Sequence, residues 1–136
     1  MAQMKLATIL LITLSMLLPT LADTDQDLFQ RSRALDQAIA SAETVDEIFP
    51  HITQTSISRI EEKDDAGKEK VLAYLQMAVE MTPEGLQVME SKIESDQAAL
   101  TVGVEEDGMS ITREVEFRKE DGQWKVDLSG FLEGLN

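Results

Sequence analysis

The chain has 136 residues, no cysteine, one histidine and a formal net charge of −14 at pH 7. A negative surface repels phosphate backbones and anionic lipid head groups, so nucleic-acid binding is not expected. Without cysteine the chain can form neither a disulfide framework nor a cysteine-ligated metal site. We interpret the excess of acidic residues as a feature that keeps the protein soluble, rather than as a surface that binds a partner.

The first 22 residues have the layout of a secretory signal peptide. Lys5 supplies a positive charge, an uncharged apolar run covers Leu6–Leu18, and Pro19 breaks it. Thr20-Leu21-Ala22 offers small residues for cleavage after Ala22. A membrane anchor is the alternative, but the run is shorter than the roughly 20 residues of a spanning helix. We therefore expect a soluble periplasmic or secreted protein with no stable membrane anchor.

The remaining residues, 23–136, suit one domain with one core. Thr24 and Asp27 form a capping-box-like pair, and apolar residues at helical spacing predict a helix over Asp25–Ala42. These apolar residues are Leu28, Leu35, Ile39 and Ala42, with Phe29 beside them. Thr44 and Glu47 repeat the capping pattern, which predicts a short second helix disturbed by Pro50.

The next stretch is less regular. His51–Ile60 fits either a helix or a strand, and Glu61–Lys70 reads as a charged connection. A third helix is predicted from Val71 to Thr82, ended by Pro83. Its apolar stripe is wide enough to predict burial on more than one side. The stripe comprises Val71, Leu72, Leu75, Ala78 and Val79, with Tyr74, Met77 and Met81 adjoining.

The last third of the chain alternates apolar and polar residues. Asp107-Gly108 and Asp121-Gly122 each join two alternating runs, the strongest short-range signal of a β-hairpin. A weaker strand is expected over Val88–Glu94, and Gly103 suggests a bulge or bend. The expected inward residues are Leu100, Val102, Val104, Met109, Ile111, Val115, Phe117, Trp124, Val126 and Leu128. A helical tail with Phe131, Leu132 and Leu135 is expected to dock on this core.

Helices followed by an antiparallel sheet define an α+β fold. The element order, and the segment from Val115 to Asp127 with its acidic-glycine turn and Trp124-Lys125-Val126, resemble the nuclear-transport-factor-2-like (cystatin-like) superfamily. The chain looks most similar to its small exported bacterial members of unknown function. The short hairpin that many members carry before the third helix is not evident. The resemblance implies a curved sheet of three to four strands wrapped on helices, a cone-like shape with an apolar pocket.

The candidate chemistry is sparse. Asp23, Asp25 and Asp27 do not start a calcium loop, because Leu28 and Ala34 occupy its glycine and glutamate positions. The single histidine, His51, has no second histidine or cysteine to share a transition metal. As a general base it would need an orienting carboxylate. We therefore predict no catalytic residue, no metal site and no cofactor from the sequence.

Arg113 breaks the alternation, because it falls between Ile111 and Val115 on the apolar face of its strand. An arginine there either forms a structural ion pair, reaches water at the end of the sheet, or lines a cavity and receives an anionic ligand. Tyr74 and Trp124 could line the same cavity, or could be core aromatics.

These observations favour an exported, non-enzymatic domain that binds a partner protein or a small ligand. The alternative is a pocket enzyme of isomerase, dehydratase or hydrolase type, with Arg113 positioning a small substrate and a carboxylate or His51 acting as base. A third alternative is an inert subunit that pairs into a homodimer through an exposed sheet face.

Overall fold

The structure is a computed structural model, and it describes residues 24–135. The predicted signal peptide, residues 1–22, lies outside the described residues. The elements are a helix over residues 24–41, the 3-10 helix η1 (Val45–His51), α2 (Gln54–Glu61), α3 (Asp65–Glu80), four strands and α4 (Ser129–Glu133). The strands are β1 (Gln87–Glu94), β2 (Gln97–Glu106), β3 (Met109–Glu120) and β4 (Gln123–Val126).

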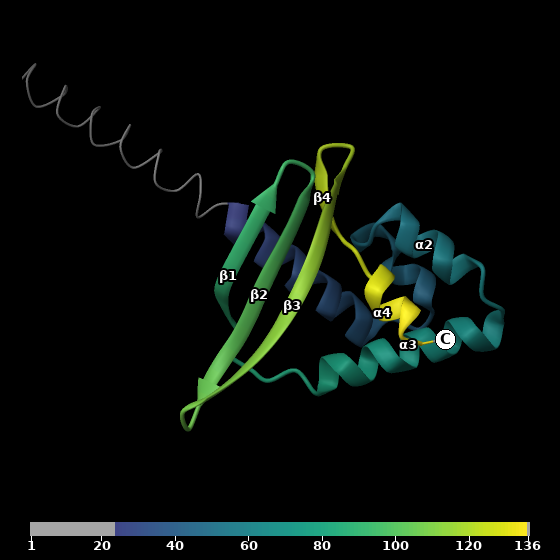
Figure 1. The fold of residues 1–136 in the computed structure, drawn as a ribbon. Helices are drawn as coiled ribbons and strands as arrows, with labels where there is room; N and C mark the ends of the chain where they lie inside the picture. Colours follow the sequence, from purple (N-terminus) through teal and green to yellow (C-terminus); the bar gives the residue numbers. More distant parts are fainter. Residues whose placement is uncertain (1–23, 136) are drawn as a thin grey trace, which may run out of the picture.

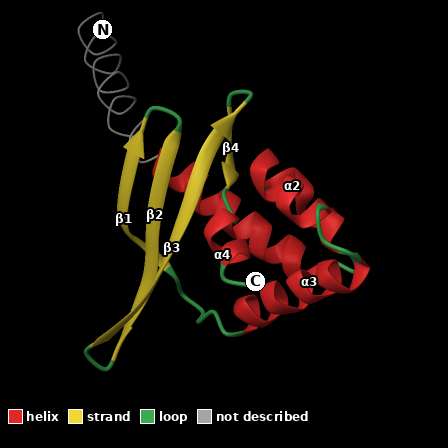
Figure 2. Cartoon of the chain, turned by 45° about the vertical axis from the view of Figure 1, so that its right-hand side comes forward, coloured by secondary structure: helices red, strands yellow, loops and turns green. Residues whose placement is uncertain are grey.

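The molecule has two layers, with the helices on one side of a curved sheet (Figures 1 and 2). All strand pairs are antiparallel, in the order β1-β2-β3-β4. The α+β class, the curved sheet and the helices-first order are therefore confirmed. No helix among residues 24–135 is long and apolar enough to cross a membrane.

The first two helical predictions are confirmed. The helix over residues 24–41 buries the apolar face expected from its spacing, together with Ser32. At η1, Glu47 accepts backbone N–H groups from Thr44 and Glu43 at 2.8 and 2.6 Å. These hydrogen bonds lower the pKa of Glu47, since they favour its charged form. Pro50 lies inside η1, which is a short 3-10 turn rather than an α-helix.

The structure corrects the middle of the sequence. The ambiguous stretch after His51 contains α2, whose first turn is capped by Thr53. The charged connection expected over Glu61–Lys70 is wrong, because α3 already begins at Asp65. Its cap is Asp64, whose Oδ1 accepts the Gly67 N–H at 2.8 Å. Charged residues there cover the solvent side of a helix rather than a loop.

Burial of α3 on more than one side is also wrong. Val71, Leu72 and Leu75 are buried, whereas the adjoining stripe of Tyr74, Met77 and Met81 is exposed. This helix packs against η1 and α2, and its second stripe faces solvent. The width of an apolar stripe alone overstated how much protein surrounds it.

Both Asp-Gly hairpins are confirmed. Asp107 and Asp121 have φ of 52° and 51°, and the glycine after each has φ of 77°, as type I′ turns require. The register pairs Leu100 with Val115 and Val102 with Arg113, so Arg113 shares the face of the buried residues. Gly103 keeps regular register, and the irregularity lies on β1 between Val88 and Glu90. A Cβ at Gly103 would lie 2.6 Å from the Ile111 carbonyl oxygen, which explains the glycine by close approach.

Not every inward residue is buried. Ile111 is 48% and Met109 69% exposed, although they lie on the same face as Val115. The β2–β3 hairpin extends past the helical layer, so its tip has nothing to pack against (Figure 1).

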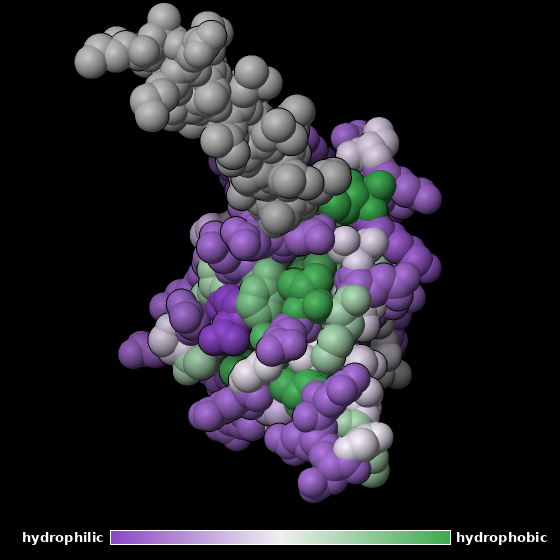
Figure 3. All heavy atoms as spheres, turned by 90° about the vertical axis from the view of Figure 1, so that its left-hand side faces the viewer, coloured by the Kyte–Doolittle hydropathy of each residue, from purple (hydrophilic) through white to green (hydrophobic). Residues whose placement is uncertain are grey.

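Figure 3 shows the side of the molecule that lies to the left in Figure 1, where apolar surface is bordered by hydrophilic residues. The exposed apolar side chains of β1 are Val88, Met89 and Ile93.

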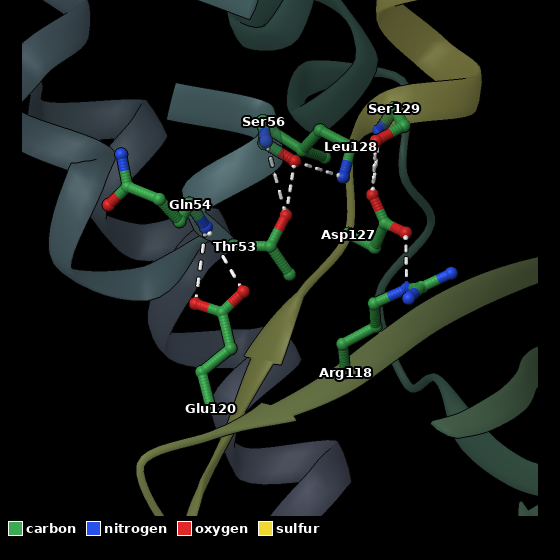
Figure 4. A network of polar contacts seen from close by, with 8 residues as sticks. All are labelled: Thr53, Gln54, Ser56, Arg118, Glu120, Asp127, Leu128 and Ser129. Carbon is green, nitrogen blue, oxygen red and sulfur yellow. Dashed lines mark hydrogen bonds and ion pairs between the residues drawn. The ribbon is translucent and has the colours of Figure 1, made fainter. Parts of the chain in front are cut away.

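A buried polar joint connects α2 to the end of the chain (Figure 4). Ser56 Oγ accepts the Leu128 N–H at 2.9 Å and lies 2.7 Å from Thr53 Oγ1. The Thr53 N–H donates to the Val126 carbonyl at 3.0 Å. Nearby, both carboxylate oxygens of Glu120 accept the Gln54 N–H at 3.1 and 3.2 Å. The joint therefore places the segment between β4 and α4 against the helical layer.

We expect Ser56→Ala to lower the free energy of unfolding by about 1–3 kcal/mol, because the Leu128 N–H loses its partner. Ser58→Ala is the matched control, since Ser58 lies on the same helix and is exposed. Urea denaturation followed by circular dichroism measures both changes. Equal stability of the two variants would contradict the role of the joint.

Candidate functional site

A cavity of about 410 Å³ lies between the two layers. Its size is within the roughly 300–1,000 Å³ of small-molecule pockets. Residues 24–41, α3, β3, β4 and α4 all contribute to its walls. Most lining side chains are apolar: Leu35, Ile39, Leu75, Ala78, Val79, Val115, Val126, Leu128 and Phe131.

Arg113 is part of the cavity wall and also forms an ion pair. Its Nη2 lies 3.1 Å from Asp36 Oδ2, and its Nη1 donates to Thr82 Oγ1 at 3.4 Å. Asp36 also lines the cavity, whereas Thr82 follows the end of α3. Arg113 therefore connects β3, the first helix and the segment after α3. The structural ion pair and the cavity-lining position considered from the sequence occur together.

The ion pair leaves part of the guanidinium without a partner. Arg113 Nε is buried and has no hydrogen-bond partner. Burying a donor without an acceptor is unfavourable, typically by about 1–3 kcal/mol. The side chain as a whole is 35% exposed, whereas that of Asp36 is 18% exposed. The cavity wall thus contains a cation that is neutralised but not fully hydrogen bonded.

The structure does not bring Tyr74 and Trp124 into this cavity. Tyr74 is an exposed residue of α3, and Lys70 Nζ lies 5.8 Å from its ring centre. It neighbours Leu75 in sequence, so it points to a different side of the helix. Trp124 is buried, and its ring lies 5.6 Å from Lys119 Nζ, outside the cavity lining. Of the three predicted ligand contacts, only Arg113 lines the cavity.

Two lining residues were missed by sequence reasoning. The sequence pattern did not single out Asp36, and it predicted Phe131 only as part of a docking tail. Asp36 and Arg113 are 77 residues apart, and no local pattern links them. For Phe131 the sequence did contain a signal, because a large aromatic side chain after the last strand is expected to pack against the rest of the protein.

His51 does not line the cavity. It lies at the end of η1, where Lys125 Nζ donates to the adjacent Pro50 carbonyl at 2.6 Å. Burial lowers the pKa of His51, and the nearby positive charge of Lys125 lowers it further. Residues 24–135 contain no group of three or more His, Cys, Asp or Glu side chains arranged to hold a metal ion.

We expect the free energy of unfolding to fall as the pH drops below 6.5, the ordinary pKa of histidine. The unfolded chain binds a proton on His51 there, but the folded chain binds it only at lower pH, so acidification favours unfolding until the folded pKa is passed. His51→Gln should flatten this dependence between about pH 5 and pH 7, since the chain has no other histidine. Urea denaturation at several pH values tests it. The same slope in both proteins would contradict the assignment.

No family model matches the chain, and no curated protein matches it. Among solved structures, it is similar to a Campylobacter jejuni protein with the provisional name NTF2-like transpeptidase. The identity is 19% and the TM-score 0.46, over 72% of this chain and 94% of that one. A de novo designed protein with a curved β-sheet has 12% identity and a TM-score of 0.39, over 81% and 94% of the two chains. The designed NTF2 fold protein NT-9 has 12% identity and a TM-score of 0.34, and the match spans 54% of this chain and 61% of NT-9.

No activity follows from these likenesses, because one fold supports many unrelated functions and function resides in the site. The structure has the arrangement that the sequence resemblance implied, helices followed by a curved antiparallel meander (Figure 1). The choice between ligand binding and catalysis therefore depends on the cavity.

Proposed function

We propose that the protein binds a small, predominantly apolar molecule in the cavity between the sheet and the helices, without transforming it. The observation that carries this proposal is the apolar lining closed at one wall by the Arg113–Asp36 pair. An apolar pocket with few polar groups is the usual form of a small-molecule site, in which apolar contacts supply affinity and polar groups set orientation.

The site supports binding over catalysis. A general base needs a group that is free to accept a proton within reach of the substrate. His51 lies outside the cavity lining, and the Asp36 carboxylate already accepts from Arg113. The remaining acidic residues that line the cavity are Glu114, Glu116 and Asp127. Glu114 and Glu116 alternate with Val115 along β3, so their side chains belong to the other face of the sheet.

The cellular setting is part of the same proposal. The signal-peptide layout of residues 1–22 supports export, and a chain without cysteine needs no disulfide to fold there. We propose that the protein works in the periplasm or outside the cell as a binding domain. A protein partner and a homodimer both remain predictions.

The test is the binding of a neutral, solvatochromic naphthylamine dye, whose fluorescence rises on transfer to an apolar site. We expect Ala78→Phe to weaken dye binding by at least about tenfold, since the added ring occupies the cavity that Ala78 lines. Ala73→Phe is the matched control, because Ala73 lies on the same helix, is exposed and does not line the cavity. Circular dichroism establishes that both variants fold.

Two results would overturn the proposal. One is the absence of dye binding to the wild-type protein together with no small molecule in native mass spectrometry. The other is equal weakening by the two alanine substitutions, which would place the dye somewhere else on the surface.

A further inference from the structure

We infer that the ligand of this cavity is electrically neutral and presents a hydrogen-bond acceptor, such as the carbonyl oxygen of an ester or amide, rather than a carboxylate. The inference rests on the proposed function, since it concerns the same cavity. It replaces the anionic ligand that the position of Arg113 suggested from the sequence.

The first argument is that the charge of Arg113 is already compensated. Its guanidinium lies 3.1 Å from the Asp36 carboxylate, and Asp36 is the less exposed partner. A ligand carboxylate on Arg113 would have to displace Asp36 or crowd a second negative charge beside it. Displacement leaves a largely buried carboxylate without its counter-ion, which is strongly unfavourable.

The second argument is the sign of the surrounding charge. Besides Asp36, the ionisable residues of the cavity lining are one cation, Arg113, and three acids. Of these acids, only Asp127 is held in an ion pair, with Arg118 at 3.5 Å. Glu114 and Glu116 belong to the other sheet face, and at 0.1 M salt a charge still acts over roughly 10 Å. The chain as a whole carries −14, so the field opposes entry of an anion.

The third argument is the unused donor capacity of Arg113. A guanidinium has five N–H donors in a planar fork. Asp36 accepts from Nη2 and Thr82 from Nη1, which leaves a second N–H group on each of these nitrogens; Nε also has no partner, but it is buried. A neutral acceptor can use a free N–H without disturbing the ion pair. Since the rest of the lining is apolar, one acceptor attached to a hydrocarbon chain or ring matches the polarity of the cavity.

The experiment compares three probes that share one hydrocarbon chain: decanoic acid, methyl decanoate and decylamine. Each competes with the naphthylamine dye for the purified protein at neutral pH and low salt. We expect the methyl ester to displace the dye at about tenfold lower concentration than the acid or the amine. The amine is disfavoured because its pairing with Asp36 would leave Arg113 without its counter-ion.

A second test removes the negative charge of Asp36. Asp36→Asn releases Arg113 from its counter-ion, so the acid should gain about tenfold in affinity while the ester changes by less than about twofold. Asp27→Asn is the matched control, because it removes the same charge from another arginine–aspartate pair, Asp27–Arg31, outside the cavity lining. The control should leave the order of the three probes unchanged.

The outcomes separate the two proposals. If the dye binds as expected but the acid or the amine competes as well as the ester in the wild type, this inference is overturned and small-molecule binding stands. If no probe and no dye binds, both fail. If Asp36→Asn folds, an equal gain for the acid in Asp27→Asn would refute the role of Asp36. If Asp36→Asn does not fold, the wild-type comparison alone decides.

Discussion

The structure depends on the register between β2 and β3. Ten consecutive pairs, from Gln97–Arg118 to Glu106–Met109, are set by the turn at Asp107 and Gly108. A slip of one residue would turn Val115 and Phe117 to solvent and bring the intervening glutamates inside. The same register places Arg113 on the inner face, two residues from the buried Val115. The core and the polar wall of the cavity therefore arise from one constraint.

Two polar contacts between elements border the cavity. Arg113 is long enough to reach Asp36 and Thr82 from β3, so it connects the layers where apolar side chains do not fill the space. After β4, the buried hydroxyl of Ser56 accepts the Leu128 N–H, and α4 then brings Phe131 to the cavity. Polar groups thus position the boundary, and apolar groups supply the lining.

Sequence reasoning succeeded where structure is local and failed where it is not. The hairpins, the capping box at Thr44 and the apolar face of the first helix follow from neighbouring residues alone, and all three were predictable. The early start of α3 was obscured by charged residues, and the exposure of Tyr74 depends on what the fold leaves uncovered. The sequence showed that Arg113 interrupts the apolar face of its strand, but it did not show that Asp36, 77 residues away, is its partner. Sites assembled from distant segments escape periodicity, because periodicity describes only one element at a time.

The joint between Ser56 and Leu128 has a consequence for the order of assembly. It joins residues 72 positions apart. Contacts this distant in sequence form slowly, because the intervening chain must be ordered first. The helical layer and the first hairpins can form while the cavity still lacks its Leu128 and Phe131 wall. A ligand that needs this wall binds only after the segment with Leu128 and Phe131 has folded, so its binding energy favours such chains over nascent chains that stop before this segment.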